Sequence, residues 1–230
     1  MRIFVAGATG ATGRVFLPRA AAAGYDVVAH VRPQSADRSP LAKDPRVRVF
    51  DLADAKAAED AMAGCGAALS FVGTMKNRFA AGDTYESSDV ASTEQLVGAA
   101  TRAKVPRFLL LSSYGAGGVG AYLQMKARCE QIVKEGTPKW TIFRPSALMS
   151  PEGGPEGTHG TRKVPAVAGA LFGALRKLPG LGPVADDMRP IPIEVLCDAM
   201  LRVLEQPRDG ATLQGRELWV LGTPVMGTPA

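Results

Sequence analysis

Short, almost wholly apolar runs recur through the first 145 residues and alternate with longer stretches of helical character. These runs are Ile3–Ala6, Val27–Val31, Val47–Phe50, Ala67–Val72, Phe108–Leu111 and Thr141–Phe143. Runs without polar alternation are typical of parallel strands that are covered on both faces. The stretches between them predict helices over 12–23, 54–63, 86–104 and 119–135. A strand followed by a helix, repeated, predicts an α/β fold with a doubly wound parallel sheet.

The pattern changes after Arg144. The elements expected there are a Gly- and Pro-rich loop over Ser150–Gly160 that can act as a lid, an apolar helix over Val164–Lys177, an amphipathic helix over Glu194–Glu205 and a late strand over Glu217–Leu221. We expect one domain over residues 1–230. Its small C-terminal lobe, mainly 146–215, would form the substrate side, and residues 223–230 would form a flexible tail.

Composition narrows the class of protein. Hydrophobic residues make up 46% and charged residues 21% of the chain, which excludes wholesale disorder and a disulfide scaffold. The net charge is +5, and the Lys and Arg residues are scattered along the sequence and not clustered, so we expect no nucleic-acid partner. Three widely spaced cysteines and two histidines do not predict a metal site and fit a reduced, cytoplasmic protein. The longest uncharged run, Phe108–Met125, holds four glycines, so we expect no membrane span.

Three glycines, Gly7, Gly10 and Gly13, directly follow the first apolar run and open the first expected helix. Backbone without Cβ atoms lets a pyrophosphate approach the amides at a helix N-terminus, where the helix dipole favours an anion. The hydroxyls of Thr9 and Thr12 can add donors. This placement predicts a dinucleotide site; the alternative is a tight strand-to-helix turn with no ligand.

The ends of the second and third expected strands bear on which dinucleotide binds. The second ends in Arg32, 25 residues after Gly7, with no carboxylate at its tip. A guanidinium matches a 2′-phosphate in charge and geometry, which predicts NADP rather than NAD unless Arg32 is an ordinary exposed arginine. The third strand is followed by Asp51 and Leu52, and Asp51 can accept from the adenine amino group or serve only as a solvated cap.

A serine, a tyrosine and a lysine form the candidate catalytic group. Tyr122 and Lys126 are four residues apart and share a helical face, and Ser113 follows the fifth expected strand. A nearby ammonium favours the phenolate, so Tyr122 could exchange a proton with a carbonyl oxygen that Ser113 positions. Lys126 would also hold the nicotinamide ribose. The alternatives are a half-buried aromatic and a solvated lysine, and Tyr114 is a competing phenol without a lysine at helical spacing.

The turn after the sixth expected strand is the candidate for the nicotinamide side. Pro145 stiffens it, and the backbone of Ser146 and Ala147 could face the carboxamide. The alternative is a plain strand exit.

Five segments together carry a resemblance to a known family: GATGATGR, DLAD, LLLSSYGA, YLQMK and FRPSALM. They resemble the atypical short-chain dehydrogenase/reductase superfamily, which has a Rossmann fold, and are most similar to its NAD(P)-binding, Tat-interacting-protein oxidoreductase-like group. The resemblance covers residues 1–150 and implies that Ser113, Tyr122 and Lys126 occupy catalytic positions. It implies that NADP is lined by Gly7, Thr9, Gly10, Ala11, Thr12, Arg32, Asp51, Leu52 and Gly73.

The function that we expect is reduction of a small carbonyl compound with NADPH by a monomer or homodimer. A cofactor-gated regulatory or scaffold protein with little turnover is the main alternative, because some relatives in the superfamily resemble redox sensors. Those sensors lack the active-site tyrosine, whereas this chain has Tyr122 and Lys126. A sugar-nucleotide epimerase is a third possibility, although such chains usually carry a larger substrate lobe. The apolar helix expected over Val164–Lys177 could line the pocket or form a dimer face.

Overall fold

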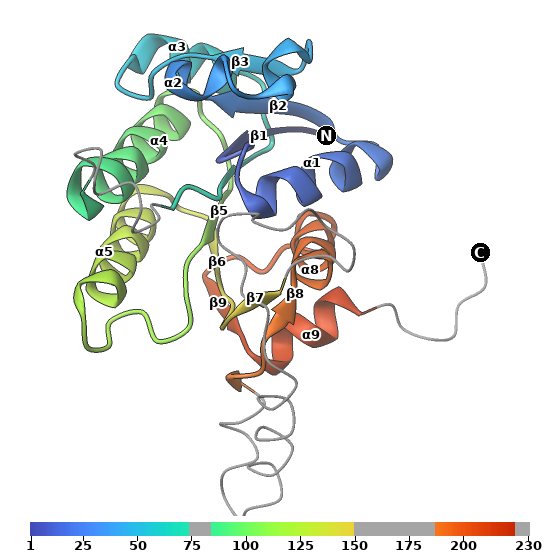
Figure 1. Cartoon of the computed structure of the whole chain (residues 1–230), viewed down its shortest axis with the longest axis vertical. Helices are drawn as coiled ribbons and strands as arrows, with labels where there is room; N and C mark the ends of the chain where they lie inside the picture. The colour runs from blue at the N-terminus through green and yellow to red at the C-terminus, as the bar shows by residue number, and fades with distance from the viewer. Residues whose placement is uncertain (74–83, 150–186, 224–230) are drawn as a thin grey trace, which may run out of the picture.

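The computed structural model describes residues 1–73, 84–149 and 187–223. Seven strands form one sheet in the order β3–β2–β1–β4–β5–β6–β9, and every pairing in it is parallel (Figure 1). The strands are β1 (Arg2–Ala6), β2 (Asp26–Val31), β3 (Val47–Val49), β4 (Ala67–Ser70), β5 (Phe108–Leu111), β6 (Trp140–Arg144) and β9 (Ala211–Gln214). The doubly wound parallel sheet predicted from the sequence is therefore confirmed.

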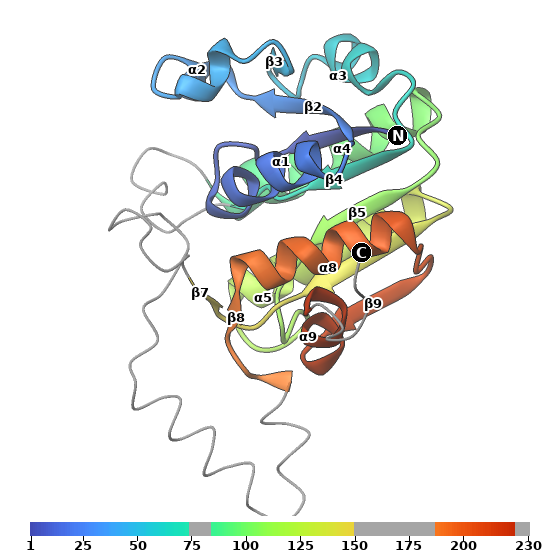
Figure 2. The ribbon, with the colours of Figure 1, turned by 90° about the vertical axis from the view of Figure 1, so that its right-hand side faces the viewer.

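Helices cover both faces of this sheet, as Figures 1 and 2 show. One face carries α1 (Ala11–Ala22) and α8 (Ile193–Glu205), with α9 (Arg216–Gly222) packed against α8. The other face carries α3 (Ala55–Met62), α4 (Ala91–Arg102) and α5 (Ala121–Gly136). None of the helices in the described ranges is both long enough and apolar enough to cross a membrane.

Shorter elements complete the described chain. They are the helix α2 (Pro33–Ala36), a 3₁₀ turn over Pro40–Lys43, a π-helical turn over Glu86–Val90 that continues into α4, and the strands β7 (Leu148–Met149) and β8 (Ile191–Pro192). The last two pair in parallel and form a small second sheet.

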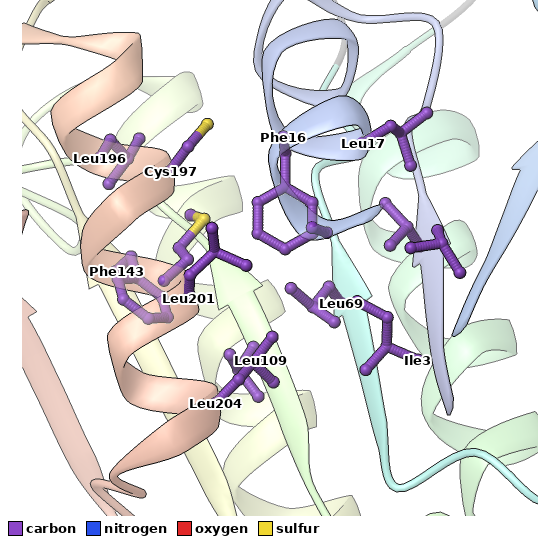
Figure 3. Packing of buried hydrophobic residues seen from close by; sticks show 14 of the residues in the cluster. Ile3, Phe16, Leu17, Leu69, Leu109, Phe143, Leu196, Cys197, Leu201 and Leu204 are labelled. Atoms are coloured by element: carbon purple, nitrogen blue, oxygen red, sulfur yellow. The ribbon is translucent and has the colours of Figure 1, made fainter. Parts of the chain in front are cut away.

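The core lies in two layers, one on each side of the sheet. Along β1, Ile3 faces the layer under α1 and α8, whereas Phe4 faces the layer under α3, α4 and α5. Figure 3 shows the first layer, in which Phe16 of α1 and Leu201 of α8 converge on the sheet residue Leu69. Because both faces are buried, β1 has no polar alternation, and this explains the continuous apolar runs of the sequence.

One sequence expectation is wrong at the C-terminal end. Glu217–Leu221 was predicted as a strand and is part of the helix α9, in which Leu218 is buried. The adjacent edge strand is instead β9, whose sequence ATLQ has only one fully buried position and so gives no apolar run. An edge strand packs less of its surface than a central strand does, which weakens the signal in its sequence.

Several predicted segments cannot be compared with the structure. The loop expected over Ser150–Gly160, the helix expected over Val164–Lys177 and the tail beyond Thr223 lie outside the described residues. Division of the chain into one domain with a small substrate-side lobe therefore stays a prediction.

A buried histidine makes stability depend on pH. His30 on β2 is 3% exposed, is flanked by the rings of Phe4 and Phe50, and has its Nε2 2.9 Å from the Phe50 carbonyl oxygen. Burial lowers the pKa of His30 below the value of about 6.5 in an unfolded chain. The fold therefore favours neutral imidazole, and the resulting stability is present above about pH 6.5 and is lost as the pH falls below it.

We expect the free energy of unfolding from urea denaturation to fall more steeply in the wild type than in His30→Gln between about pH 7.5 and pH 5.5. The variant removes the titrating group and leaves the carboxylates unchanged. Equal slopes for the two proteins would contradict this interpretation.

Candidate functional site

The residues expected in the site gather at one edge of the sheet. All strands of the main sheet are parallel, so their carboxyl ends lie together, and each expected residue lies just beyond such an end or in the first two turns of the following helix. The chain leaves β1 and β4 toward opposite halves of the sheet, and ligands of open α/β sheets bind at this kind of switch point.

The turn after β1 is built from close backbone contacts that only glycine permits. Gly7 has a φ of +82°, and a Cβ on it would lie 2.7 Å from the carbonyl carbon of Phe71, which follows β4. A Cβ on Gly13 would lie 2.4 Å from the Gly7 carbonyl oxygen. The N–H of Gly10 donates to that same oxygen at 3.1 Å. The three glycines therefore hold the start of α1 against the turn.

The N-terminus of α1 fits a phosphate. Gly10 is its N-cap, no side chain caps it within the described residues, and its first turn holds no acidic residue. The first intrahelical bond runs from the Arg14 N–H to the Gly10 carbonyl, so the amides of Ala11, buried Thr12 and Gly13 precede it and keep their hydrogen-bonding capacity for an anion. Thr9 is half-buried, and its carbonyl accepts from the Arg14 Nε at 2.9 Å. The turn after β1 has no room for Cβ atoms at Gly7 and Gly13, and it leads into a helix whose N-terminus no described side chain caps. This arrangement suits a dinucleotide pyrophosphate.

Arg32 and Asp51 lie at the ends of neighbouring strands. Arg32 directly follows β2 and is the half-buried N-cap residue of α2. Asp51 lies just beyond β3 and is exposed, and its Oδ1 accepts from the Ala53 N–H at 2.9 Å, while Leu52 between them is buried. Asp51 therefore serves as a turn cap here, and its contact with adenine stays a prediction.

Tyr122 and Lys126 share one face of α5, as their spacing predicts. The Lys126 Nζ lies 5.9 Å from the centre of the Tyr122 ring. The lysine side chain is 7% exposed, whereas Tyr122 is 38% exposed and accessible to a substrate. A Cβ on Gly73, beyond β4, would lie 3.7 Å from the same Nζ, so the ammonium lies against the backbone that follows β4.

Ser113 lies at the same edge, two residues beyond Leu111, the last residue of β5. It is half-buried, and its Oγ is 3.4 Å from the Tyr114 carbonyl oxygen, a long and weak hydrogen bond. That the hydroxyls of Ser113 and Tyr122 bind the same substrate oxygen stays a prediction.

Sequence reasoning missed Asp89, the partner of the buried lysine. Asp89 lies in the π-helical turn before α4, is 1% exposed, and has its Oδ1 3.7 Å from the Lys126 Nζ. Opposite charges this deeply buried compensate each other, and removal of one would leave the other uncompensated. A signal was present in the sequence, because Asp89 lies seven residues before the buried Leu96 and so falls on the apolar face of the same helical run.

A second aromatic residue adjoins Tyr122. The rings of Tyr85 and Tyr122 are 6.0 Å apart between centres and tilted by 58°. Burial and the neighbouring Tyr122 both raise the pKa of Tyr85, so this phenol remains neutral. Tyr114, the competing phenol of the sequence, lies in the loop after β5, where its N–H donates to the Pro145 carbonyl at 2.8 Å.

The turn after β6 is fixed by contacts to the C-terminal part of the chain. Pro145 is buried, and the Ser146 Oγ donates to the Arg189 carbonyl oxygen at 2.6 Å. The Ala147 carbonyl accepts from the Ile191 N–H at 2.9 Å, next to the pairing of β7 with β8. The Ser146 hydroxyl is thus engaged in holding the turn, which leaves backbone groups as the candidates for a carboxamide.

Comparisons with known proteins agree with this geometry. A family model described as NAD(P)H-binding matches residues 7–168. A short-chain dehydrogenase/reductase superfamily protein from Agrobacterium tumefaciens, solved with NAD, is 19% identical, with a TM-score of 0.68 over 94% of this chain and 77% of that one. No curated protein matches the chain.

Two further solved structures have the same fold. The oxidoreductase ylbE from Lactococcus lactis is 24% identical, with a TM-score of 0.52 over 65% of this chain and 70% of that one. A UDP-glucuronic acid 4-epimerase from Bacillus cereus, solved with NAD, is 17% identical, with a TM-score of 0.61 over 94% of this chain and 78% of that one. At these identities the structural likeness establishes the fold alone.

Proposed function

Because the chain belongs to the NAD(P)H-binding family, we propose that it is an NADPH-dependent oxidoreductase that reduces a small carbonyl compound through Ser113, Tyr122 and Lys126. The observation that carries the proposal is the position of Lys126. Its buried ammonium lies beside the accessible Tyr122 ring and against the backbone of Gly73, at the ligand-binding edge of a dinucleotide-type sheet. A solvated helical lysine would have neither contact.

The chain's own residues supply the acid–base part of this chemistry. The Tyr122 hydroxyl donates its proton to the carbonyl oxygen, and the Lys126 ammonium stabilises the phenolate that results. The Ser113 hydroxyl donates a hydrogen bond to the same oxygen and positions it. When bound, NADPH supplies the hydride that the carbonyl carbon receives.

The cofactor would lie along the edge of the sheet from β3 to β6. The pyrophosphate would meet the turn after β1, Arg32 would pair with the 2′-phosphate, and Lys126 would hold the nicotinamide ribose. The other residues that would hold NADPH are Gly7, Thr9, Gly10, Ala11, Thr12, Gly13, Asp51, Leu52, Gly73, Pro145 and Ser146. The resemblance to the Tat-interacting-protein oxidoreductase-like group, a cytoplasmic location and a monomeric or homodimeric state belong to the same proposal.

The proposal is tested by fluorescence titration of the purified protein with NADPH and NADH, followed by a screen of aldehydes and ketones. We expect tighter binding of NADPH and oxidation of the cofactor in the presence of at least one carbonyl compound. Binding without turnover on any compound would instead support a regulatory or scaffold protein that NADP(H) controls. Absence of binding would overturn both functions.

Cofactor preference is tested at Arg32. We expect Arg32→Asp to weaken NADPH binding about 10- to 100-fold, because a charge-assisted bond is lost and a repulsive charge replaces it. NADH binding should be unchanged or tighter, because a carboxylate at this strand end accepts from a ribose diol. Arg208→Asp makes the same charge change on an exposed residue before β9. Arg208 lies at the amino ends of the strands, away from the proposed site, so this variant should leave both affinities unchanged. Equal NADPH affinity in Arg32→Asp and the wild type would contradict the assignment.

A further inference from the structure

One buried carboxylate, that of Glu130, joins three of the elements that carry the proposed site, namely α5, β5 and β6. Glu130 lies on α5 four residues after Lys126 and is 2% exposed. Its Oε1 accepts from the Ser112 hydroxyl at 2.6 Å and from the Arg144 Nε at 2.8 Å, and its Oε2 accepts from the Arg144 Nη2 at 2.5 Å. Ser112 follows β5 and Arg144 ends β6, so one side chain ties both strand ends to α5.

The backbone on both sides of Ser113 is also tied to β6 and the turn after it. The Ser112 N–H donates to the Phe143 carbonyl and the Tyr114 N–H donates to the Pro145 carbonyl, each at 2.8 Å. Ser113 is therefore held between two anchored neighbours. One of these neighbours, Ser112, also carries the hydroxyl that is bound to Glu130, so the place of Ser113 relative to α5 depends on that bond.

A charge as buried as that of Glu130 is costly, and it is compensated here by a bidentate guanidinium. The two bonds raise the pKa of Arg144, and the Lys134 Nζ lies 3.8 Å from the Glu130 Oε2. Apolar side chains of similar volume would pack the same space with no desolvation cost. Stability alone therefore does not account for the pair, whereas its directional bonds fix the relative positions of three elements.

We propose that Glu130 is a positioning residue that fixes the hydroxyl of Ser113 and the turn at Pro145 relative to Tyr122, an inference that rests on the proposed function. Glu130 acts through Ser112 and Arg144, whose hydrogen bonds its carboxylate accepts.

The sharpest variant is Ser112→Ala, which removes the bond to β5 and leaves the Glu130–Arg144 pair intact. We expect kcat for carbonyl reduction to fall about tenfold, because a small displacement of a positioned group slows the reaction without weakening substrate binding. The Kd for NADPH and the KM for the carbonyl compound should stay within about twofold of wild type. An unchanged kcat would overturn the proposal.

The matched control is Thr137→Val. Thr137 is a buried residue at the far end of α5, and its hydroxyl donates to the Val133 carbonyl at 2.8 Å. This variant also loses one buried hydroxyl and should lose a similar free energy of unfolding with no change in kcat. If the two variants lowered kcat equally, the role of Ser112 would be merely structural and the proposal would fail.

A second pair of variants separates stability from positioning at Glu130 itself. Glu130→Gln leaves Arg144 without its counter-charge and should be strongly destabilised. The double variant Glu130→Gln with Arg144→Gln removes both charges and should recover much of the stability while kcat stays low. Recovery of kcat together with stability would overturn the proposal.

Amide hydrogen exchange tests the inference without the reaction. In Ser112→Ala, the amides of residue 112 and Tyr114 should exchange faster than in wild type, whereas Thr137→Val should leave them unchanged. Unchanged exchange in Ser112→Ala would overturn the positioning role even in an active enzyme. If Ser112→Ala exchanged faster but the wild-type protein reduced no carbonyl compound, the positioning role of Glu130 would stand. The proposed function would then be wrong.

Discussion

Replacement of Tyr122 by phenylalanine should lower kcat for carbonyl reduction by about 10²- to 10⁴-fold, the range that a positioned general acid contributes. The ring, its contact with Tyr85 and its place 5.9 Å from the Lys126 Nζ would all remain, because only the hydroxyl is removed. The Kd for NADPH, measured by fluorescence titration, should stay close to that of wild type. Turnover and binding would therefore separate in this variant.

Two other phenols serve as controls. Tyr85→Phe removes a hydroxyl from the neighbouring ring, whose raised pKa makes it a poor partner for proton exchange, and should keep most of the activity. Tyr114→Phe removes the competing phenol of the loop after β5 and should do the same. Normal turnover in Tyr122→Phe would refute the catalytic assignment, and loss of turnover in Tyr114→Phe alone would transfer it to Tyr114.

The central part of the fold was predictable because its signals are local. Five of the six apolar runs correspond to strands that are almost wholly buried, β1, β2, β4, β5 and β6, so the pattern of the sequence and the burial of the structure coincide there. The sixth, Val47–Phe50, corresponds to the edge strand β3, in which only Val47 is buried. The seventh strand, β9, lies at the other edge and reads ATLQ, in which Thr212 and Gln214 are polar, so the sequence holds no apolar run that predicts it. The run ELWVL in α9 is short and apolar, and a run of this length does not distinguish a strand from a helix.

Some residues of the candidate site were likewise predictable from local spacing, and others were not. Gly7, Gly10, Gly13, Tyr122 and Lys126 were predicted because their roles depend on spacing along one turn or one helix. The partners of the buried charges depend on tertiary contacts instead. The carboxylate of Glu130 meets groups that are 18 and 14 residues away in the sequence, and no local rule links them.

Addition of a single methyl group at Gly13 should remove both cofactor binding and a large part of the stability. In a helix, Gly→Ala is normally favourable by about 1 kcal/mol. At Gly13 the new Cβ would lie 2.4 Å from the Gly7 carbonyl oxygen and 2.7 Å from the Ala8 Cα, and neither backbone atom can rotate away. Overpacking of this kind costs about 1–3 kcal/mol or more, which outweighs the gain in propensity.

Relief of that contact requires α1 to move away from the turn after β1, which would displace the amides that are proposed to hold the pyrophosphate. We therefore expect Gly13→Ala to lower the free energy of unfolding in urea by about 1–3 kcal/mol and the affinity for NADPH at least about 100-fold.

Gly98→Ala is the matched control, because Gly98 lies within α4, where a Cβ would lie 3.3 Å from the Arg102 Nη1, an atom at the end of a long side chain and not of the backbone. That variant should gain about 0.5–1 kcal/mol of stability and bind NADPH as wild type does. Opposite signs for the same substitution in two helices would show that the glycine at position 13 serves the turn. A Gly13→Ala protein with wild-type stability and wild-type affinity would mean that α1 does not rest on the turn as described.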